Sequence, residues 1–186
     1  MKLSLMLLLV ISVLAGCGQS KSSLDQAALL RERILQCDTC EFDGEITVDY
    51  GDEVYAFTLH CYMTNDGDVN FSVVSPEVIS GIKGVITSES GTITFDDTVL
   101  AFEMIVDELV APIAAPWIML HALRGGYIQC SSSVDHGFYL QINDSYRGTA
   151  VKNEIWLNEA YIPTRCEMLW NGRRLLSMNI TNFTIV

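Results

Sequence analysis

The clearest candidate for a chemical modification in this sequence is Cys17. It ends the stretch Leu14-Ala15-Gly16-Cys17, which follows Lys2 and an almost wholly apolar run over residues 3–14. This stretch matches the bacterial lipobox, in which small residues let a peptidase grip the extended chain. The thiol is the nucleophile that accepts a diacylglyceryl group. The alternative is an ordinary signal peptide with a chance cysteine. We expect a lipoprotein signal peptide over residues 1–16 and lipidation of Cys17.

The apolar run is shorter than the roughly 20 residues that span a bilayer as a helix, so it fits a signal peptide better than a membrane anchor. A diacylglycerol on Cys17, together with an N-acyl chain such as palmitate, provides the two chains that stable anchoring needs. Residues 17–23 then form a lipidated, small and polar tether, and residues 24–186 form one domain. The predicted location is the extracytoplasmic face of the cell membrane, with the membrane as a partner through the lipid.

Five further cysteines follow, and their number is odd, so at least one is free or bridged to another chain. Cys37 and Cys40 have Cys-x-x-Cys spacing but lie where a helix ends and a strand begins, which favours a structural bridge over a redox motif. The expected strand register puts Cys40 diagonal to Cys61. We predict a Cys40–Cys61 disulfide, with Cys37–Cys61 and Cys37–Cys40 as alternatives, and expect Cys130 and Cys166 to be free.

The other residues that could do chemistry give little support to catalysis. His60, His121 and His136 lack zinc-site spacing, and the sequence has no Gly-x-Ser-x-Gly motif and no phosphate-binding loop. His121 lies in an apolar segment and is interpreted as a core histidine, whereas His60 alternates with apolar residues and is expected at the surface. We therefore expect no enzyme activity, no catalytic residues, no metal and no cofactor.

The charge balance excludes one class of partner. The chain has 23 acidic and 11 basic residues and a net charge of −12, without a cluster of Lys or Arg. Because binding to phosphates needs a basic surface, nucleic acid is not an expected partner.

The elements that position these residues begin with a helix. Ser23 and Gln26 resemble a capping box, and the helix is expected to continue to about Gln36. Apolar residues then alternate with polar ones over three strands, at about 41–50, 53–63 and 69–73, which are separated by turns containing Gly51 and Gly67. These turns place Ile46 opposite Phe57 and Leu59 opposite Val73, so one face of the meander is apolar.

The remaining segments continue the pattern. Residues 112–124 predict a helix that is apolar nearly all round, with Pro112 at its start and Gly125 at its end. Such a helix has to be buried or held inside something concave. Further strands are expected at 83–88, 91–96, 98–104, 127–132, 137–143, 149–157, 163–170 and 173–184, which gives about eleven strands and two helices.

This order of helix, meander, apolar helix and second meander behind a lipobox resembles the LolA/LolB superfamily of lipoprotein carriers. The segment Val74-Ser75-Pro76-Glu77-Val78-Ile79-Ser80-Gly81-Ile82 is similar to the "SPE…G" segment of Gram-positive LolA-like lipoproteins. The tail is similar too, with Ile162-Pro163 opening a strand and residues 180–183 closing the last one. The resemblance implies a mainly β fold with two helices (α+β): an open antiparallel half-barrel of about eleven strands, capped by helices, that binds acyl chains on its concave face.

One departure from the carrier pattern bears on function. In the carriers an arginine near the start of the fold controls the lid, whereas Arg31 and Arg33 lie on the first helix of this chain and are not clear counterparts. Shuttling of lipoproteins is therefore not expected. A permanently lipidated protein of this fold is closer to LolB, or to the clostridial germination lipoproteins of GerS type, which act through protein partners.

The apolar face of the meander and the apolar helix form the candidate site. The same alternation fits a half-barrel that is open and one that is filled, so both remain possible. The first functional hypothesis is a lipid or an acylated ligand bound in a concave groove. The alternative is a lipid-anchored adaptor that regulates a cell-envelope or spore-cortex enzyme, with an envelope protein as partner. The predicted groove residues are Phe42, Ile46, Val48, Tyr55, Phe57, Leu59, Phe71 and Val73, with Trp117, Ile118 and Leu120 as the lid.

Overall fold

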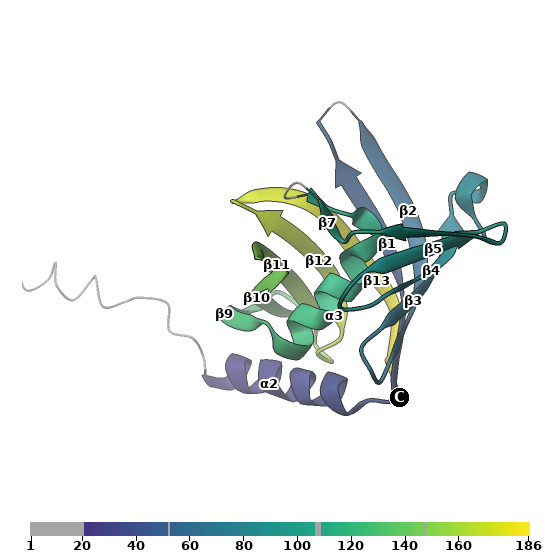
Figure 1. Ribbon diagram of the computed structural model, residues 1–186. Helices are drawn as coiled ribbons and strands as arrows, with labels where there is room; N and C mark the ends of the chain where they lie inside the picture. The colour runs from purple at the N-terminus through teal and green to yellow at the C-terminus, as the bar shows by residue number, and fades with distance from the viewer. Residues whose placement is uncertain (1–20, 52, 107–108, 147) are drawn as a thin grey trace, which may run out of the picture.

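A computed structural model describes residues 21–51, 53–106, 109–146 and 148–186 (Figure 1). The predicted signal peptide and Cys17 lie outside the described residues. In the described part of the chain, neither α-helix has the length and apolar character that are needed to cross a membrane.

One antiparallel sheet of eleven strands makes up most of the fold and curves around one side of the molecule (Figure 1). Its two outermost strands each pair with one neighbour only, so the sheet is an open half-barrel, as predicted. From one edge to the other the strands are β6 (Thr98–Phe102), β5 (Gly91–Phe95), β4 (Lys83–Ile86), β3 (Val69–Ser75), β2 (Val54–Thr64), β1 (Thr39–Asp49), β13 (Arg173–Ile185), β12 (Pro163–Trp170), β11 (Thr149–Asn158), β10 (Gly137–Tyr146) and β9 (Tyr127–Val134).

The middle of the sheet is a seam between β1 and β13. Cys40 pairs with Ile185 at one end of this seam, and Val48 pairs with Leu176 at the other. Each side of the seam is a meander in which strands that follow one another in sequence are neighbours. The fold therefore consists of two meanders that are joined only when the last strand pairs with the first.

The two residue pairs that the sequence analysis predicted across neighbouring strands are confirmed. Ile46 lies opposite Phe57, and Leu59 lies opposite Val73. The turn between β12 and β13 has Asn171 at φ 47° and Gly172 at φ 79°. Two positive φ angles in a row are what an Asn-Gly hairpin turn provides. Alternation and turn chemistry together set which side chains share a face.

Two helices cover the half-barrel. Helix α2 (Lys21–Gln36) crosses one end of the molecule and begins two residues before the predicted cap, whereas helix α3 (Ala115–Gly125) lies inside the concave face (Figure 1). Helix α3 follows a short 3-10 turn, η2 (Pro112–Ala114). Three short elements were not predicted from the sequence: η1 (Glu77–Ile79) and the two-stranded pair β7 (Ile105–Val106) and β8 (Leu109–Val110).

Candidate functional site

The predicted groove residues lie together on the concave face, and the structure fills most of that face. Tyr55 is the exception, with 51% of its surface exposed, and Phe57 beside it is half-buried. The other predicted groove and lid residues are all buried: Phe42, Ile46, Val48, Leu59, Phe71, Val73, Trp117, Ile118 and Leu120. Tyr55 therefore lies at the exposed end of the predicted groove, and its contact with a ligand stays a prediction.

Helix α3 is the cover. It is apolar on nearly every side, and eight of its eleven residues are buried. The predicted groove residues beneath it are buried as well, apart from Tyr55 and Phe57. A small cavity of about 20 Å³, below the usual 300–1,000 Å³ of ligand pockets, is lined by Val48, Val110 and Leu175 together with Asp49, Tyr50, Arg173 and Arg174. Of the two possibilities that the sequence left open, the buried side chains favour the filled half-barrel.

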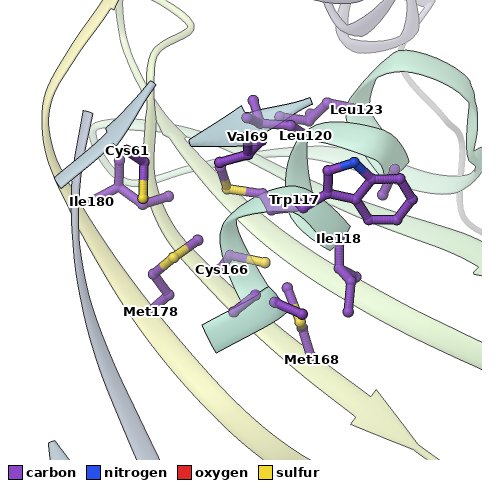
Figure 2. Close-up of a cluster of buried hydrophobic side chains, with 14 of the residues drawn as sticks. Cys61, Val69, Trp117, Ile118, Leu120, Leu123, Cys166, Met168, Met178 and Ile180 are labelled. Atoms are coloured by element: carbon purple, nitrogen blue, oxygen red, sulfur yellow. The ribbon is translucent and has the colours of Figure 1, made fainter. Parts of the chain in front are cut away.

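The floor beneath α3 is rich in sulfur. Cys61, Cys166, Met168 and Met178 are fully buried, and Met63 is almost so. Figure 2 shows Cys166, Met168 and Met178 gathered near Trp117 and Ile118 of the helix. Unbranched thioether side chains change rotamer easily and adapt to differently shaped neighbours. A floor of this composition can repack around another apolar occupant at lower cost than one of β-branched side chains.

The five described cysteines are all free thiols, so the predicted Cys40–Cys61 disulfide is not formed in the structure. Cys61 pairs with Phe42, and Cys40 pairs with Met63, which leaves the two cysteines diagonal as expected. Diagonal positions lie about 7–8 Å apart, which is beyond the reach of a disulfide. Burial raises the pKa of the Cys40 thiol to about 12 and that of Cys61 further still, which makes both poorly reactive.

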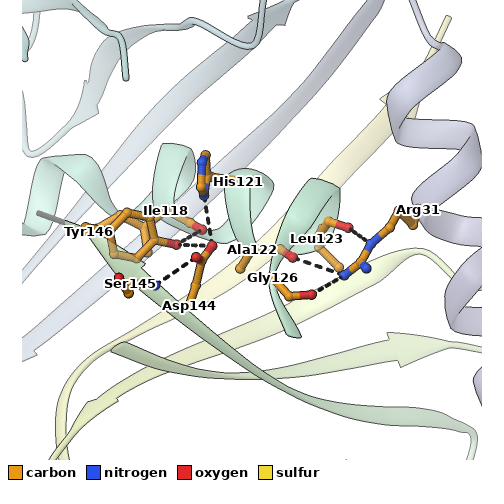
Figure 3. A network of polar contacts seen from close by, with 9 residues as sticks. All are labelled: Arg31, Ile118, His121, Ala122, Leu123, Gly126, Asp144, Ser145 and Tyr146. Atoms are coloured by element: carbon orange, nitrogen blue, oxygen red, sulfur yellow. Dashed lines mark hydrogen bonds and ion pairs between the residues drawn. The ribbon is translucent and has the colours of Figure 1, made fainter. Parts of the chain in front are cut away.

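Arg31 holds the C-terminal end of α3 from outside (Figure 3). Its Nε donates to the Leu123 carbonyl at 2.8 Å, and its Nη2 donates to the Gly126 carbonyl at 2.6 Å. The last carbonyls of a helix lack partners within the helix and carry partial negative charge, so a guanidinium satisfies them well. The sequence analysis placed Arg31 on the first helix without a role. Its spacing of four residues from the buried Ala27 could have placed it beside the packing face.

A second polar contact holds the middle of α3 against β10 (Figure 3). Asp144 Oδ2 lies 2.8 Å from His121 Nδ1 and 3.0 Å from the Tyr146 hydroxyl, which is also 3.1 Å from the Ile118 carbonyl. Burial and the negative charge of Asp144 raise the pKa of Tyr146, so its hydroxyl stays protonated and donates. His121 was expected in the core, but 44% of its side chain is exposed.

This histidine–carboxylate pair has a positional role. The Trp117 ring stacks on His121 with the ring centroids 4.6 Å apart, so the pair also fixes an aromatic residue of the lid. In the part of the chain that the structure describes, no group of three or more His, Cys, Asp or Glu side chains could hold a metal ion. Arg31, Asp144 and the Tyr146 hydroxyl thus supply polar attachments for a helix whose remaining surface is mostly in apolar contact.

Comparison with known proteins by sequence finds no matching family and no matching curated protein. The solved structures, in contrast, include proteins of the same architecture. A domain described as an outer membrane lipoprotein-sorting protein from Vibrio parahaemolyticus is 10% identical, with 89% of this chain and 92% of that chain covered and a TM-score of 0.51.

Two further structures extend this likeness. A DUF1329 family protein from Desulfovibrio piger is 10% identical over 91% of this chain and 94% of that one, with a TM-score of 0.50. A LolA superfamily protein from Nitrosomonas europaea is also 10% identical over 91% and 94% of the two chains, with a TM-score of 0.47. At such identities a likeness concerns the fold. The chain has the fold of the lipoprotein-sorting domain from Vibrio parahaemolyticus and of the DUF1329 protein.

Proposed function

We propose that this chain is a lipoprotein of the extracytoplasmic membrane surface that binds an acyl chain on the concave face of its half-barrel. The ligand would lie between the sheet and α3, after the helix moves outward. The observation that carries the proposal is the adaptable sulfur-rich floor beneath a helix that is apolar on nearly every side. Both surfaces that would enclose the ligand are apolar, so either can exchange its present partner for a hydrocarbon chain.

The attachment of α3 supports such a movement. Its polar contacts include the carbonyl bonds to Arg31 and the His121–Asp144 pair, which are partly exposed, and the bond from the Tyr146 hydroxyl to the Ile118 carbonyl, which is buried. Water can replace hydrogen bonds at the partly exposed positions at modest cost. Apolar packing between the helix and the sheet would be replaced by packing of both against the ligand. Burial of apolar surface contributes about 25 cal/mol per Å² whichever group supplies it, so the exchange is close to balanced.

Anchoring is tested separately from binding. Cys17→Ala should leave an uncleaved precursor or a protein that is poorly retained on membranes, because the lipid attachment site is gone. Ser23→Ala, in the predicted tether, is a matched control that should be processed and retained normally. A Cys17→Ala protein that is fully processed and firmly membrane-bound would contradict the lipoprotein assignment.

Binding is tested on the purified full chain by mass spectrometry of co-extracted lipid and by a long-chain fluorescent fatty acid. Competition by unlabelled acyl lipids should displace the probe. Phe57→Asp puts a charge on the half-buried rim of the concave face and should abolish binding, whereas Tyr62→Asp on the convex face of the same strand should not. Circular dichroism on both variants shows whether the domain is folded. A folded wild-type protein that binds no apolar probe would overturn the proposal.

A second candidate function is the lipid-anchored adaptor, and the exposed edge of the sheet favours it. Strand β6 is an outer strand, and Val99 and Leu100 on it are 64% and 61% exposed. An unpaired apolar edge can accept an extended strand from another protein. A photo-crosslinker at Val99 should then capture one envelope protein repeatedly, and Leu100→Lys should remove that product. Lipid binding without any such product would reject the adaptor.

A further inference from the structure

A buried amide on the concave face is unpaired in this structure. Asn153 in β11 has no exposed surface, and neither its Nδ2 nor its Oδ1 has a hydrogen-bond partner among the described residues. Buried polar groups are almost always hydrogen-bonded, because an unpaired amide costs about 1–3 kcal/mol. Because this unpaired amide destabilises the unliganded protein, we expect a bound molecule to supply its hydrogen-bond partner.

The amide points to the same face as the sulfur-rich floor. On β11 it lies between the buried Val151 and Ile155 on the same face of the strand. Across the sheet it pairs with Ile142 on β10 and Met168 on β12. All four of these neighbours are apolar and buried. Asn153 is thus a polar group surrounded by apolar side chains on the surface on which an acyl chain would lie.

The polar network on β10 does not satisfy this amide. Burial and Asp144 raise the pKa of Tyr146, and an interaction with the Asn153 side chain opposes that rise, so the amide lies beside the phenol. The Tyr146 hydroxyl lies within hydrogen-bond distance of the Ile118 carbonyl and Asp144, and by geometry neither polar atom of Asn153 has a hydrogen-bond partner in the part of the chain that the structure describes. The amide is thus next to this network without a hydrogen bond of its own.

We propose that Asn153 donates a hydrogen bond to the carbonyl oxygen of an ester- or amide-linked acyl group, and so selects acyl ligands over plain alkyl chains. This inference rests on the proposed function and names its ligand class. The acyl chain would cover Met168 and Met178, while the carbonyl meets the amide at their border. A free fatty acid fits less well, because its carboxylate would be desolvated close to the Asp144–Tyr146 pair.

The test uses two probes that differ only in the carbonyl. The full chain is reconstituted in phosphatidylcholine vesicles with a diazirine-bearing 1-palmitoylglycerol or with its ether counterpart, 1-O-hexadecylglycerol with the same diazirine. Photo-crosslinking is quantified by mass spectrometry. The wild-type protein should label about tenfold more efficiently with the ester, which is the discrimination expected of one buried hydrogen bond.

Two variants separate recognition from structure. Asn153→Leu keeps the branched shape without polar atoms. It should equalise labelling by the two probes and raise the temperature of unfolding, because the unpaired amide is gone. Met168→Leu, the neighbour across the sheet, is the matched control and should keep the preference for the ester.

The three outcomes are distinct. Equal labelling of the wild-type protein by ester and ether, as expected if Asn153 only holds a buried water, overturns the inference and leaves the proposed function standing. Labelling by neither probe overturns the proposed function itself. If Asn153→Leu does not fold, the ester-to-ether ratio of the wild-type protein still decides the question, and Asn153→Val replaces it as the variant.

Discussion

Strand β2 passes through two different environments on one face of the sheet. Leu59, Cys61 and Met63 lie under α3 and are buried, whereas Phe57 is half-buried and Tyr55 is half-exposed at the rim. All five alternate regularly along the same strand and point to the same side. What separates the covered floor from the rim is the extent of α3. The apolar pattern of a strand therefore reports which face is apolar, and the packing of another element decides how much of it is closed.

The largest difference should be in the reactivity of thiols beneath α3 and of a thiol outside it. Cys61 and Cys166 lie under α3 and should react with an alkylating reagent only when the domain unfolds, at least about a thousandfold more slowly than in denaturant. The half-buried Cys37, outside the cover, should react in the native state. Peptide mapping of the protein after alkylation without reductant measures both. A disulfide-linked peptide containing Cys40 and Cys61 would contradict the free thiols.

Removal of a large side chain from the covered floor should have the largest effect on stability. Phe42 is fully buried and stacks on Phe183 with the ring centroids 5.5 Å apart. Phe42→Ala should lower the free energy of unfolding by about 3–5 kcal/mol, through reduced burial and the cavity that remains. Urea titration followed by tryptophan fluorescence measures the change. A decrease of less than about 1 kcal/mol would mean that the floor is loosely packed around an opening.

Added volume should be poorly tolerated in the same region. A Cβ at Gly84 would collide with the Thr92 carbonyl oxygen and the ring of Phe71, and the backbone oxygen cannot move aside easily. Gly84→Ala should destabilise the domain by about 1–3 kcal/mol. Gly125→Ala is the matched control, because no atom lies within 4 Å of its added methyl group. Equal melting temperatures for the two variants would argue against the close approach of β3, β4 and β5.

Weaker attachment of α3 should have a smaller effect on stability, but it should measurably speed the entry of apolar probes to the concave face. Arg31→Met keeps the length of the side chain but removes the hydrogen bonds to the α3 carbonyls, at a cost of about 1–2 kcal/mol. If α3 moves to admit ligand, this variant should also take up an apolar fluorescent probe faster than the wild type. Arg33→Met, on the exposed side of α2, is the control. Slower uptake by the Arg31 variant would contradict a movable cover.

Substitution at the rim should change the stability of the domain least. Tyr55→Ser alters a half-exposed side chain that lies beyond α3, and we expect a change in unfolding free energy of less than about 0.5 kcal/mol. A calorimetric scan beside the Phe42→Ala variant makes the contrast direct. A large destabilisation at Tyr55 would show that the rim is packed against another part of the chain.

The sequence predicted the sheet and the apolar helix well, but it did not predict the polar contacts that attach this helix, for physical reasons. The pairing of Ile46 with Phe57 follows from the period of two and the position of a turn, which are both local. The contact of Arg31 with α3 joins residues more than 90 positions apart, and no local pattern encodes it. Asn153 gave a signal that was overlooked, because it is the polar residue in the otherwise apolar alternation of Val151, Ile155 and Leu157.

The seam between β1 and β13 has a consequence for how the chain folds. It joins residues as far apart as Glu41 and Thr184, which are separated by 143 positions, while the other strand pairs of the sheet join consecutive strands. Contacts of such long range form late, because the chain must first close a large loop. Each meander can begin as hairpins while the chain is synthesised, but the two cannot combine before residues 173–185 are available. Until then their apolar faces stay exposed, so loss of the last strand should prevent folding of the whole domain.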